Sequence, residues 1–251
     1  YIMMCCVMML EINSVNRVML WVCLYFFGLV GFLNGVSANA TVNLMEKKQH
    51  KLFMSTCHGM YSMGGALSGG IAALLFLIHV PSGIQIVLVA LVIILVILSN
   101  KKYLVSNTDI FNSRSSFKLT SASILGISFI CMVSFMGEGC VADWSAIYFK
   151  EILFAPKALI SLGYAGFSVA MTVGRLNGDM LIRRLGSKNV IVSGALLAGF
   201  GFLTVVSSVN VGMAITGYIL VGLGSCCIVP ILFRASANIP GLSTVEGYAM
   251  I

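Results

Sequence analysis

Charged residues are scarce in this chain, and that scarcity excludes an ordinary soluble domain. Asp, Glu, Lys and Arg make up 9% of the 251 residues, whereas hydrophobic residues make up 59%. In soluble globular domains about a quarter of the residues are charged. The mean hydropathy of +1.02 points the same way, so the composition predicts a protein that lies in lipid.

Sequence motifs of enzymes, metal sites and nucleic-acid binding are also missing. There is no GxSxG, HExxH, Walker or dinucleotide-binding motif. The three histidines are too dispersed to chelate a metal, and the eight cysteines form no CxxC pattern, which favours small, reduced core residues. The net charge of +7 comes without a basic stripe interleaved with aromatic residues. We therefore expect no enzyme, no cofactor or metal, and no nucleic-acid partner.

Long hydrophobic runs are what the chain has in abundance. A helix needs about 20 apolar residues to cross roughly 30 Å of hydrocarbon. The runs therefore predict an all-α, polytopic membrane helix bundle with about seven full spans and two partial ones. The full spans are expected at 18–42, 53–79, 82–99, 119–149, 158–182, 189–208 and 210–234, and the partial ones at 1–10 and from 244.

The basic residues are distributed unevenly between the two sets of connecting loops. Because cytoplasmic loops are enriched in Lys and Arg, the richer side is expected to face the cytoplasm. That side holds Lys47, Lys48, Lys51, Lys101, Lys102, Arg114, Lys118, Arg183, Arg184, Lys188 and Arg234, and the other side holds Arg17, Lys150 and Lys157.

The longest polar stretch, 100–118, is rich in Ser, Asn and Lys, as interdomain linkers are. We expect residues 1–99 to be part of an N-terminal half, 100–118 a cytoplasmic linker, and 119–251 part of a C-terminal half. A weak glycine repeat 194 residues apart, beginning at Gly28 and at Gly222, agrees with two related halves. If each half has six helices, the chain runs from about helix 3 to the start of helix 11, and is expected to be a fragment.

Residues 174–186 (GRLNGDMLIRRLG) place four charges and three glycines between two uncharged apolar stretches. This pattern is typical of a transporter gate. Arg175 and Asp179 lie four residues apart on a predicted helix, close enough to pair. They serve either as a gate or as a structural pair that neutralises two charges near lipid. The segment also contributes Gly178, Gly186 and the basic residues Arg183 and Arg184, which are expected to meet phosphate headgroups.

Glu138 and Asp143 are the only acids between Lys118 and Lys150. An ionised carboxylate inside a membrane costs several kcal/mol unless it is paired, so both are candidates for proton coupling. Glu138 has an equally plausible place at the outer interface. Trp144 is a candidate for stacking on a solute in the cavity, although an interfacial tryptophan anchor is commoner.

Polar residues within two other predicted spans give further candidates. Asn34 and Asn39 are expected to line a cavity or to hold neighbouring helices together. His58 and Tyr61, one turn apart, form a possible proton relay, or His58 is a hydrogen-bonded structural residue. Small faces for helix packing are expected from Gly64, Gly65, Gly69 and Gly70 in 53–79 and from Gly163, Gly166, Gly174 and Gly178 in 158–182.

Three segments carry a resemblance to a known family: EGCVADWS at 138–145, GYAGFSVAMTVGRLNGD at 163–179, and FMSTCHGMYSMGG at 53–65. With this topology, the chain resembles the major facilitator superfamily, and within it the bacterial YbjJ-like transporters near the fucose-permease group. The resemblance implies a twelve-helix, two-half fold that rocks between inward-open and outward-open states, with solute bound between the halves. It also implies a location in the bacterial inner membrane. One departure is that Arg183 stands where the family's cytoplasmic motif has an acid, and Asp179 is expected to substitute.

The sequence thus predicts a secondary active transporter of a small polar solute, sugar-like or a related metabolite, coupled to protons and embedded in membrane lipid. An efflux carrier of the same fold is the first alternative. A membrane scaffold that transports nothing is the second.

Overall fold

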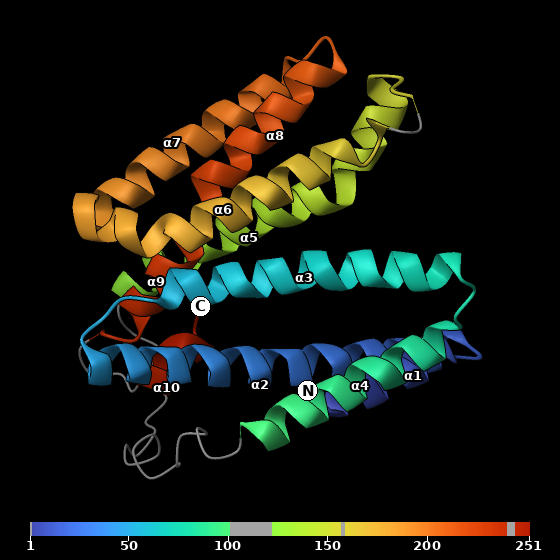
Figure 1. The fold of residues 1–251 in the computed structure, drawn as a ribbon. Helices are drawn as coiled ribbons and strands as arrows, with labels where there is room; N and C mark the ends of the chain where they lie inside the picture. Colours follow the sequence, from blue (N-terminus) through green and yellow to red (C-terminus); the bar gives the residue numbers. More distant parts are fainter. Residues whose placement is uncertain (1, 101–121, 157–158, 240–243) are drawn as a thin grey trace. The chain divides into compact units, whose positions relative to one another are not determined.

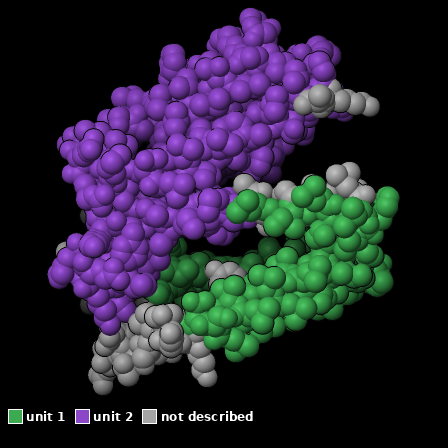
Figure 2. Space-filling view, viewed as in Figure 1, with its two compact units in different colours: residues 1–41, 67–114 green, residues 42–66, 115–251 purple. Residues whose placement is uncertain are grey.

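The computed structural model describes residues 2–100, 122–156, 159–239 and 244–251, and the regular secondary structure in these ranges is helical throughout (Figure 1). Contacts divide the chain into two compact units, coloured separately in Figure 2. Unit 1 comprises residues 1–41 and 67–114, and unit 2 comprises 42–66 and 115–251. The all-α class predicted from the hydrophobic runs is confirmed.

Unit 1 contains α1 (Ile2–Ile12), most of α2 (Arg17–Gln49), the later part of α3 (Met54–Leu77) and α4 (Ser82–Ser99). α1 packs against α4, where Met9 lies beside Gly83. Helix α4 begins directly after Pro81, whose fixed φ suits the start of a helix, and its bounds are those predicted from the sequence.

Unit 2 contains the end of α2, the start of α3, and α5 (Ala122–Ile147), which continues as a π-helical turn, Tyr148–Ile152. It also contains α6 (Leu162–Leu185), α7 (Ser187–Val206), α8 (Val211–Ser225), α9 (Ile228–Ser236) and α10 (Thr244–Ala249). Helices α6 and α7 both pack along α8 (Figure 1). The core of the unit lies among these helices and includes Phe149, Phe167, Met171, Tyr218 and Val221.

Glycines set the close approach of α7 to α8. A Cβ atom on Gly194 would come within 2.5 Å of the carbonyl oxygen of Gly224, and one on Gly201 within 2.8 Å of that of Gly217. Real side chains cannot approach a backbone so closely, so these positions admit only glycine without a shift of the helices. Such small-residue contacts are typical of helix packing in membranes, where the hydrophobic effect does not drive helices together.

The span predicted at 210–234 corresponds to a helical stretch, Val211–Ser236, that is long and apolar enough to cross a membrane. The stretch is broken in the middle, because α8 ends at Ser225 and α9 begins at Ile228. Pro230 explains the break, since its ring clashes with the carbonyl of the residue four positions earlier and its nitrogen donates no hydrogen bond. In the first turn of α9 the missing donor costs nothing. Cys226 and Cys227 form the turn between the two helices.

Helix α2 is longer than predicted, since it continues past residue 42 to Gln49 and carries Glu46 on its last turns. Among the described residues, five helical stretches are long and apolar enough to cross a membrane: Arg17–Gln49, Ser82–Ser99, Ile124–Ile152, Ser187–Val206 and Val211–Ser236. Helix α6 falls short of this criterion, and it carries four charged residues.

Several predictions fall outside the described residues. They are the linker from residue 101 to 118 and the basic loop residues Lys101, Lys102, Arg114, Lys118 and Lys157. The membrane orientation, and the division into halves at 99 and 119, therefore remain predictions. The contacts themselves group residues 42–66 with 115–251.

Candidate functional site

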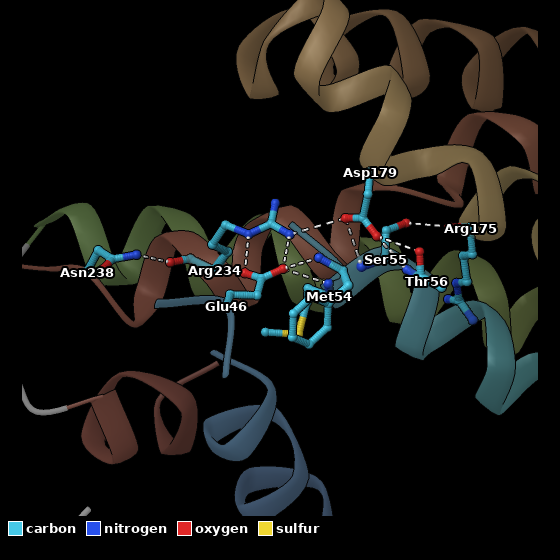
Figure 3. A network of polar contacts seen from close by, with 9 residues as sticks. Glu46, Met54, Ser55, Thr56, Arg175, Asp179, Arg234 and Asn238 are labelled. Atoms are coloured by element: carbon cyan, nitrogen blue, oxygen red, sulfur yellow. Dashed lines mark hydrogen bonds and ion pairs between the residues drawn. The ribbon is translucent and has the colours of Figure 1, made fainter. Parts of the chain in front are cut away.

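The start of α3 is capped by two carboxylates of unit 2, one from Glu46, shortly before it in the sequence, and one from Asp179 on α6 (Figure 3). Glu46 Oε1 accepts hydrogen bonds from the backbone N–H groups of Phe53 and Met54 at 2.6 and 2.7 Å. Asp179 accepts from the N–H groups of Ser55 at 3.2 Å and Thr56 at 2.8 Å. The first N–H groups of a helix have no partner within the helix and carry partial positive charge, so two anions satisfy and neutralise this terminus.

Arg234 of α9 bridges the two carboxylates. Its Nε and Nη2 atoms donate to Glu46 Oε2 and Oε1 at 2.9 and 2.8 Å, and Nη2 also donates to Asp179 Oδ1 at 3.3 Å. The side chains of Glu46, Asp179 and Arg234 are only 5%, 4% and 15% exposed. We call these three residues the capping cluster. A buried charge network of this kind is stable only while every member is paired.

Two further hydrogen bonds near Asp179 connect α6 to α3. The Thr56 hydroxyl donates to Asp179 Oδ2 at 2.8 Å, and the Ser55 hydroxyl donates to the Arg175 carbonyl oxygen, also at 2.8 Å. Gly178 makes this approach possible, because a Cβ there would overlap the Ser55 hydroxyl. Asp179 therefore accepts three hydrogen bonds from the first turn of α3 in addition to its ion pair with Arg234.

Arg175 forms a second buried cluster, one turn away on α6. Its Nη2 atom contacts both carboxylate oxygens of Glu138 on α5, at 3.1 and 3.2 Å. Nη1 donates to the Ser62 hydroxyl at 2.7 Å, and Nε donates to the Cys226 carbonyl oxygen at 3.4 Å. One guanidinium thus connects α3, α5, α6 and the turn between α8 and α9. We call Arg175, Glu138 and Ser62 the Arg175 cluster.

The expected pairing of Arg175 with Asp179 is wrong. The two residues lie on one face of α6, but each is paired with another helix: Asp179 with α3 and Arg234, Arg175 with Glu138. A helix N-terminus plus a guanidinium gives Asp179 more contacts than a single partner one turn away on its own helix. The assignment of Arg234 to a basic loop is also wrong, because Arg234 lies within α9 and its side chain belongs to the capping cluster.

The two candidate proton-coupling acids differ in their surroundings. Glu138 is largely buried and held by Arg175, whereas Asp143 is exposed on α5. Trp144 is also exposed. The structure therefore brings Glu138 into a charge cluster and leaves Asp143 and Trp144 on the outside of unit 2.

The candidates of the earlier helices are also separated. In unit 1, the Asn34 amide donates to the Met4 sulfur at 3.1 Å, and the Asn39 amide donates to the Gly35 carbonyl at 2.9 Å within the same helix. In unit 2, the His58 ring stacks on Phe233 with centroids 5.9 Å apart, whereas Tyr61 is exposed. His58 and Tyr61 thus face different surroundings.

The remaining residues of the 174–186 segment end α6. Arg183 and Arg184 are exposed on its last turn. Gly186 follows with φ of 80° and ψ of 151°, a conformation that is essentially restricted to glycine. The glycine faces predicted at Gly163, Gly166, Gly174 and Gly178 are confirmed as close contacts. The prediction for Gly64, Gly65, Gly69 and Gly70 of α3 stays a prediction.

Sequence reasoning missed Glu46, Ser55, Thr56, Ser62 and the role of Arg234. For two of them, Glu46 and Arg234, the sequence does contain a pattern that indicates a buried ion pair. Glu46 is an acid at the end of an apolar run, directly before Lys47 and Lys48, and Arg234 is one of two charged residues after Lys188. A lone charge in an apolar stretch indicates a buried partner of opposite sign.

Apolar helices joined by buried charge clusters define a polytopic membrane protein whose helices meet through ion pairs. Comparison with known protein families shows to which family it belongs. Residues 1–244 match the sequence profile of the Major Facilitator Superfamily, and the chain belongs to this family.

Named relatives agree with this membership. An uncharacterised MFS-type transporter of Yersinia pestis is 34% identical over 218 residues, which cover 86% of this chain and 56% of that protein. An uncharacterised transporter of Sinorhizobium fredii is 30% identical over 227 residues, 88% of this chain and 59% of that protein. The membrane protein MosC of Rhizobium meliloti is 30% identical over 125 residues, half of this chain and 30% of that protein. The chain spans somewhat more than half the length of the first two relatives.

Proposed function

We propose that the protein is a secondary active transporter of a small polar solute, sugar-like or a related metabolite, and that the capping cluster is its cytoplasmic gate. Family membership supports transport, and the two relatives that are named as transporters support it further. The observation that carries the gate is the set of contacts by which Asp179 and Arg234 hold the start of α3 and the end of α2.

The capping cluster joins segments that the predicted division assigns to different halves. Glu46 and the start of α3 fall within 1–99, and Asp179 and Arg234 fall within 119–251. Alternating access requires two halves to separate on one side of the membrane while they meet on the other. Opening at this cluster separates Asp179 from two backbone N–H groups and the Thr56 hydroxyl, and separates Arg234 from Glu46, at the same time. The contact therefore behaves as a two-state element.

Glu138 is the better supported of the two candidate proton-coupling acids. Its carboxylate is held by Arg175, which also contacts α3 through Ser62. Protonation of Glu138 removes its charge and leaves the buried guanidinium without its anionic partner, so the proton changes the contact between α5, α6 and α3. Asp143 is exposed and contributes no comparable link.

The coupling is tested by replacing Glu138 with Gln in the full-length protein reconstituted in liposomes. A thermal-shift screen of polar solutes first identifies a solute that stabilises the protein. Glu138→Gln is expected to abolish uptake driven by a proton gradient while exchange of the solute across the membrane continues. Asp143→Asn is the matched control and is expected to retain gradient-driven uptake. Uptake by Glu138→Gln at the rate of the unmodified protein would contradict the assignment.

A further inference from the structure

The turn between α8 and α9 holds two adjacent cysteine thiols that the proposed transport function does not use. Cys226 and Cys227 are 4% and 2% exposed, and their sulfur atoms are 3.5 Å apart. Both are free thiols. Because a disulfide bond is about 2.05 Å long, the two sulfurs are not bonded to each other, although they lie side by side.

This spacing suits one soft atom bound to both sulfurs. With bonds of roughly the 2.3 Å that zinc makes to sulfur, a separation of 3.5 Å corresponds to an angle of about 100° at the bridging atom. Soft, thiophilic atoms prefer sulfur ligands. Trivalent arsenic meets these conditions, since it forms two bonds to a pair of neighbouring thiols and needs no oxidant.

The pair is enclosed by the glycine face of α6. A Cβ on Gly174 would come within 2.5 Å of the Cys226 sulfur, and one on Gly178 within 2.7 Å of the Cys227 sulfur. In this conformation there is no room for an added atom between the sulfurs and α6. Binding on the side of the pair that faces α6 therefore requires α6 to move away from the turn.

The two glycines alternate along α6 with the residues that hold the charge clusters. Arg175 follows Gly174 and donates to the Cys226 carbonyl, and Asp179 follows Gly178 and contacts Arg234. Movement of α6 away from the cysteines thus separates the same surfaces that the proposed gate holds together. On that side, access to the thiols is therefore expected only when the capping cluster is open.

We propose that Cys226 and Cys227 form a dithiol site for a trivalent arsenical, and that its occupation holds α6 away from the turn between α8 and α9. With phenylarsine oxide, both thiols lose their protons, two sulfur–arsenic bonds form, and the arsenic-bound oxygen leaves as water. The oxidation state of arsenic does not change. The dependence of binding on conformation rests on the gate proposed above, whereas the dithiol site itself does not.

The test treats the purified full-length protein in detergent with phenylarsine oxide and measures adducts by intact mass. The variant Cys5→Ser, Cys6→Ser serves as background, because it removes the other adjacent cysteine pair. One phenylarsenic group per chain is expected, resistant to excess monothiol and removed by a small dithiol. Cys226→Ser and Cys227→Ser, each alone, are expected to abolish it, whereas Cys131→Ser, which removes a buried single cysteine, leaves it unchanged.

The outcomes separate the two proposals. The dithiol site is overturned if the dithiol-reversible adduct persists when either cysteine is replaced, or if the folded protein forms none although the denatured chain does. The variant Asp179→Asn is expected to speed adduct formation about 10- to 100-fold, because it weakens the capping cluster. An adduct that requires both cysteines but forms at an unchanged rate in Asp179→Asn would retain the dithiol site and refute the gate.

Discussion

Replacing Asp179 by Asn is the sharpest perturbation of the capping cluster. The amide keeps nearly the same size but has one acceptor oxygen in place of two and carries no charge. Asp179 uses both oxygens, one toward the Thr56 N–H and hydroxyl and the other toward the Ser55 N–H and Arg234. At least one of these groups must therefore face the amide NH₂, which donates rather than accepts.

The expected magnitude follows from these contacts. A hydrogen bond to a charged group contributes about 1.5–3 kcal/mol, and Asp179→Asn loses at least one. Because about 1.4 kcal/mol corresponds to a tenfold change in an equilibrium constant, the population in which α6 has left the start of α3 is expected to rise about 10- to 100-fold. The Cys227 sulfur, which lies against Gly178 and Ser55, becomes accessible only in that population.

The assay is the rate of maleimide alkylation of Cys227 in a variant whose other seven cysteines are serine. Asp179→Asn is expected to raise this rate by the factor given above. Glu151→Gln is the matched control, because Glu151 pairs with Lys150 on the surface, where an ion pair contributes little. A parallel single-cysteine variant that retains only the fully buried Cys131 reports unfolding, and its rate is expected to stay constant. A Cys227 rate in Asp179→Asn within about twofold of the unmodified protein would refute the reasoning that the charge of Asp179 holds α6 in place.

Three further predictions use the unfolding free energy of the protein in detergent, measured with denaturant. Arg234→Gln leaves two buried carboxylates without their shared cation and is expected to cost about 3–5 kcal/mol; a cost below about 1 kcal/mol would show that the cluster is not desolvated. Gly178→Ala introduces a methyl group that overlaps Ser55 and is expected to cost about 1–3 kcal/mol, with Gly139→Ala, which faces open space, as the unaffected control. Gly186→Ala forces alanine into a conformation essentially limited to glycine and is expected to cost about 1–3 kcal/mol; a neutral result would mean that the turn after α6 adopts another conformation.

The helices were largely predictable because a helix that crosses lipid needs a run of about 20 apolar residues, and such runs are visible in the sequence. The run at 82–99 has no charge and is bounded by Pro81 and Asn100, and α4 has these bounds. Hydrophobic runs did not predict the helix bounds where a second local effect also acted on the backbone. Pro230 interrupts an apolar stretch that composition alone assigns to one helix, and the charged end of α2 stays helical because Glu46 is buried against the start of α3.

The sequence predicted which segment contributes to the candidate site, but it did not predict which residues pair there. The segment 174–186 stands out because charges are rare elsewhere, and both charge clusters do contain a residue from it. The partners were not predictable, because Glu46 and Arg234 are 188 residues apart and the start of α3 offers backbone N–H groups, which no side-chain pattern reveals. Spacing along one helix predicts which residues can pair, but it does not weigh that pair against a helix terminus brought up by tertiary packing.

The glycines and the charges of α6 act together. Gly174 and Gly178 let α6 approach the Cys226–Cys227 turn and Ser55 more closely than any other residue type would allow. Only at that approach can Arg175 reach the Cys226 carbonyl and Asp179 reach the first turn of α3. A methyl group on either glycine and a lost charge on Asp179 should therefore shift the same equilibrium, the one between α6 packed against the start of α3 and α6 moved away from it. The effects of Gly178→Ala and Asp179→Asn on Cys227 alkylation are accordingly expected to be less than additive when combined, because an opening already produced by one leaves less for the other to change. Full additivity of the two free-energy changes would mean that the packing and the ion pairs hold α6 independently.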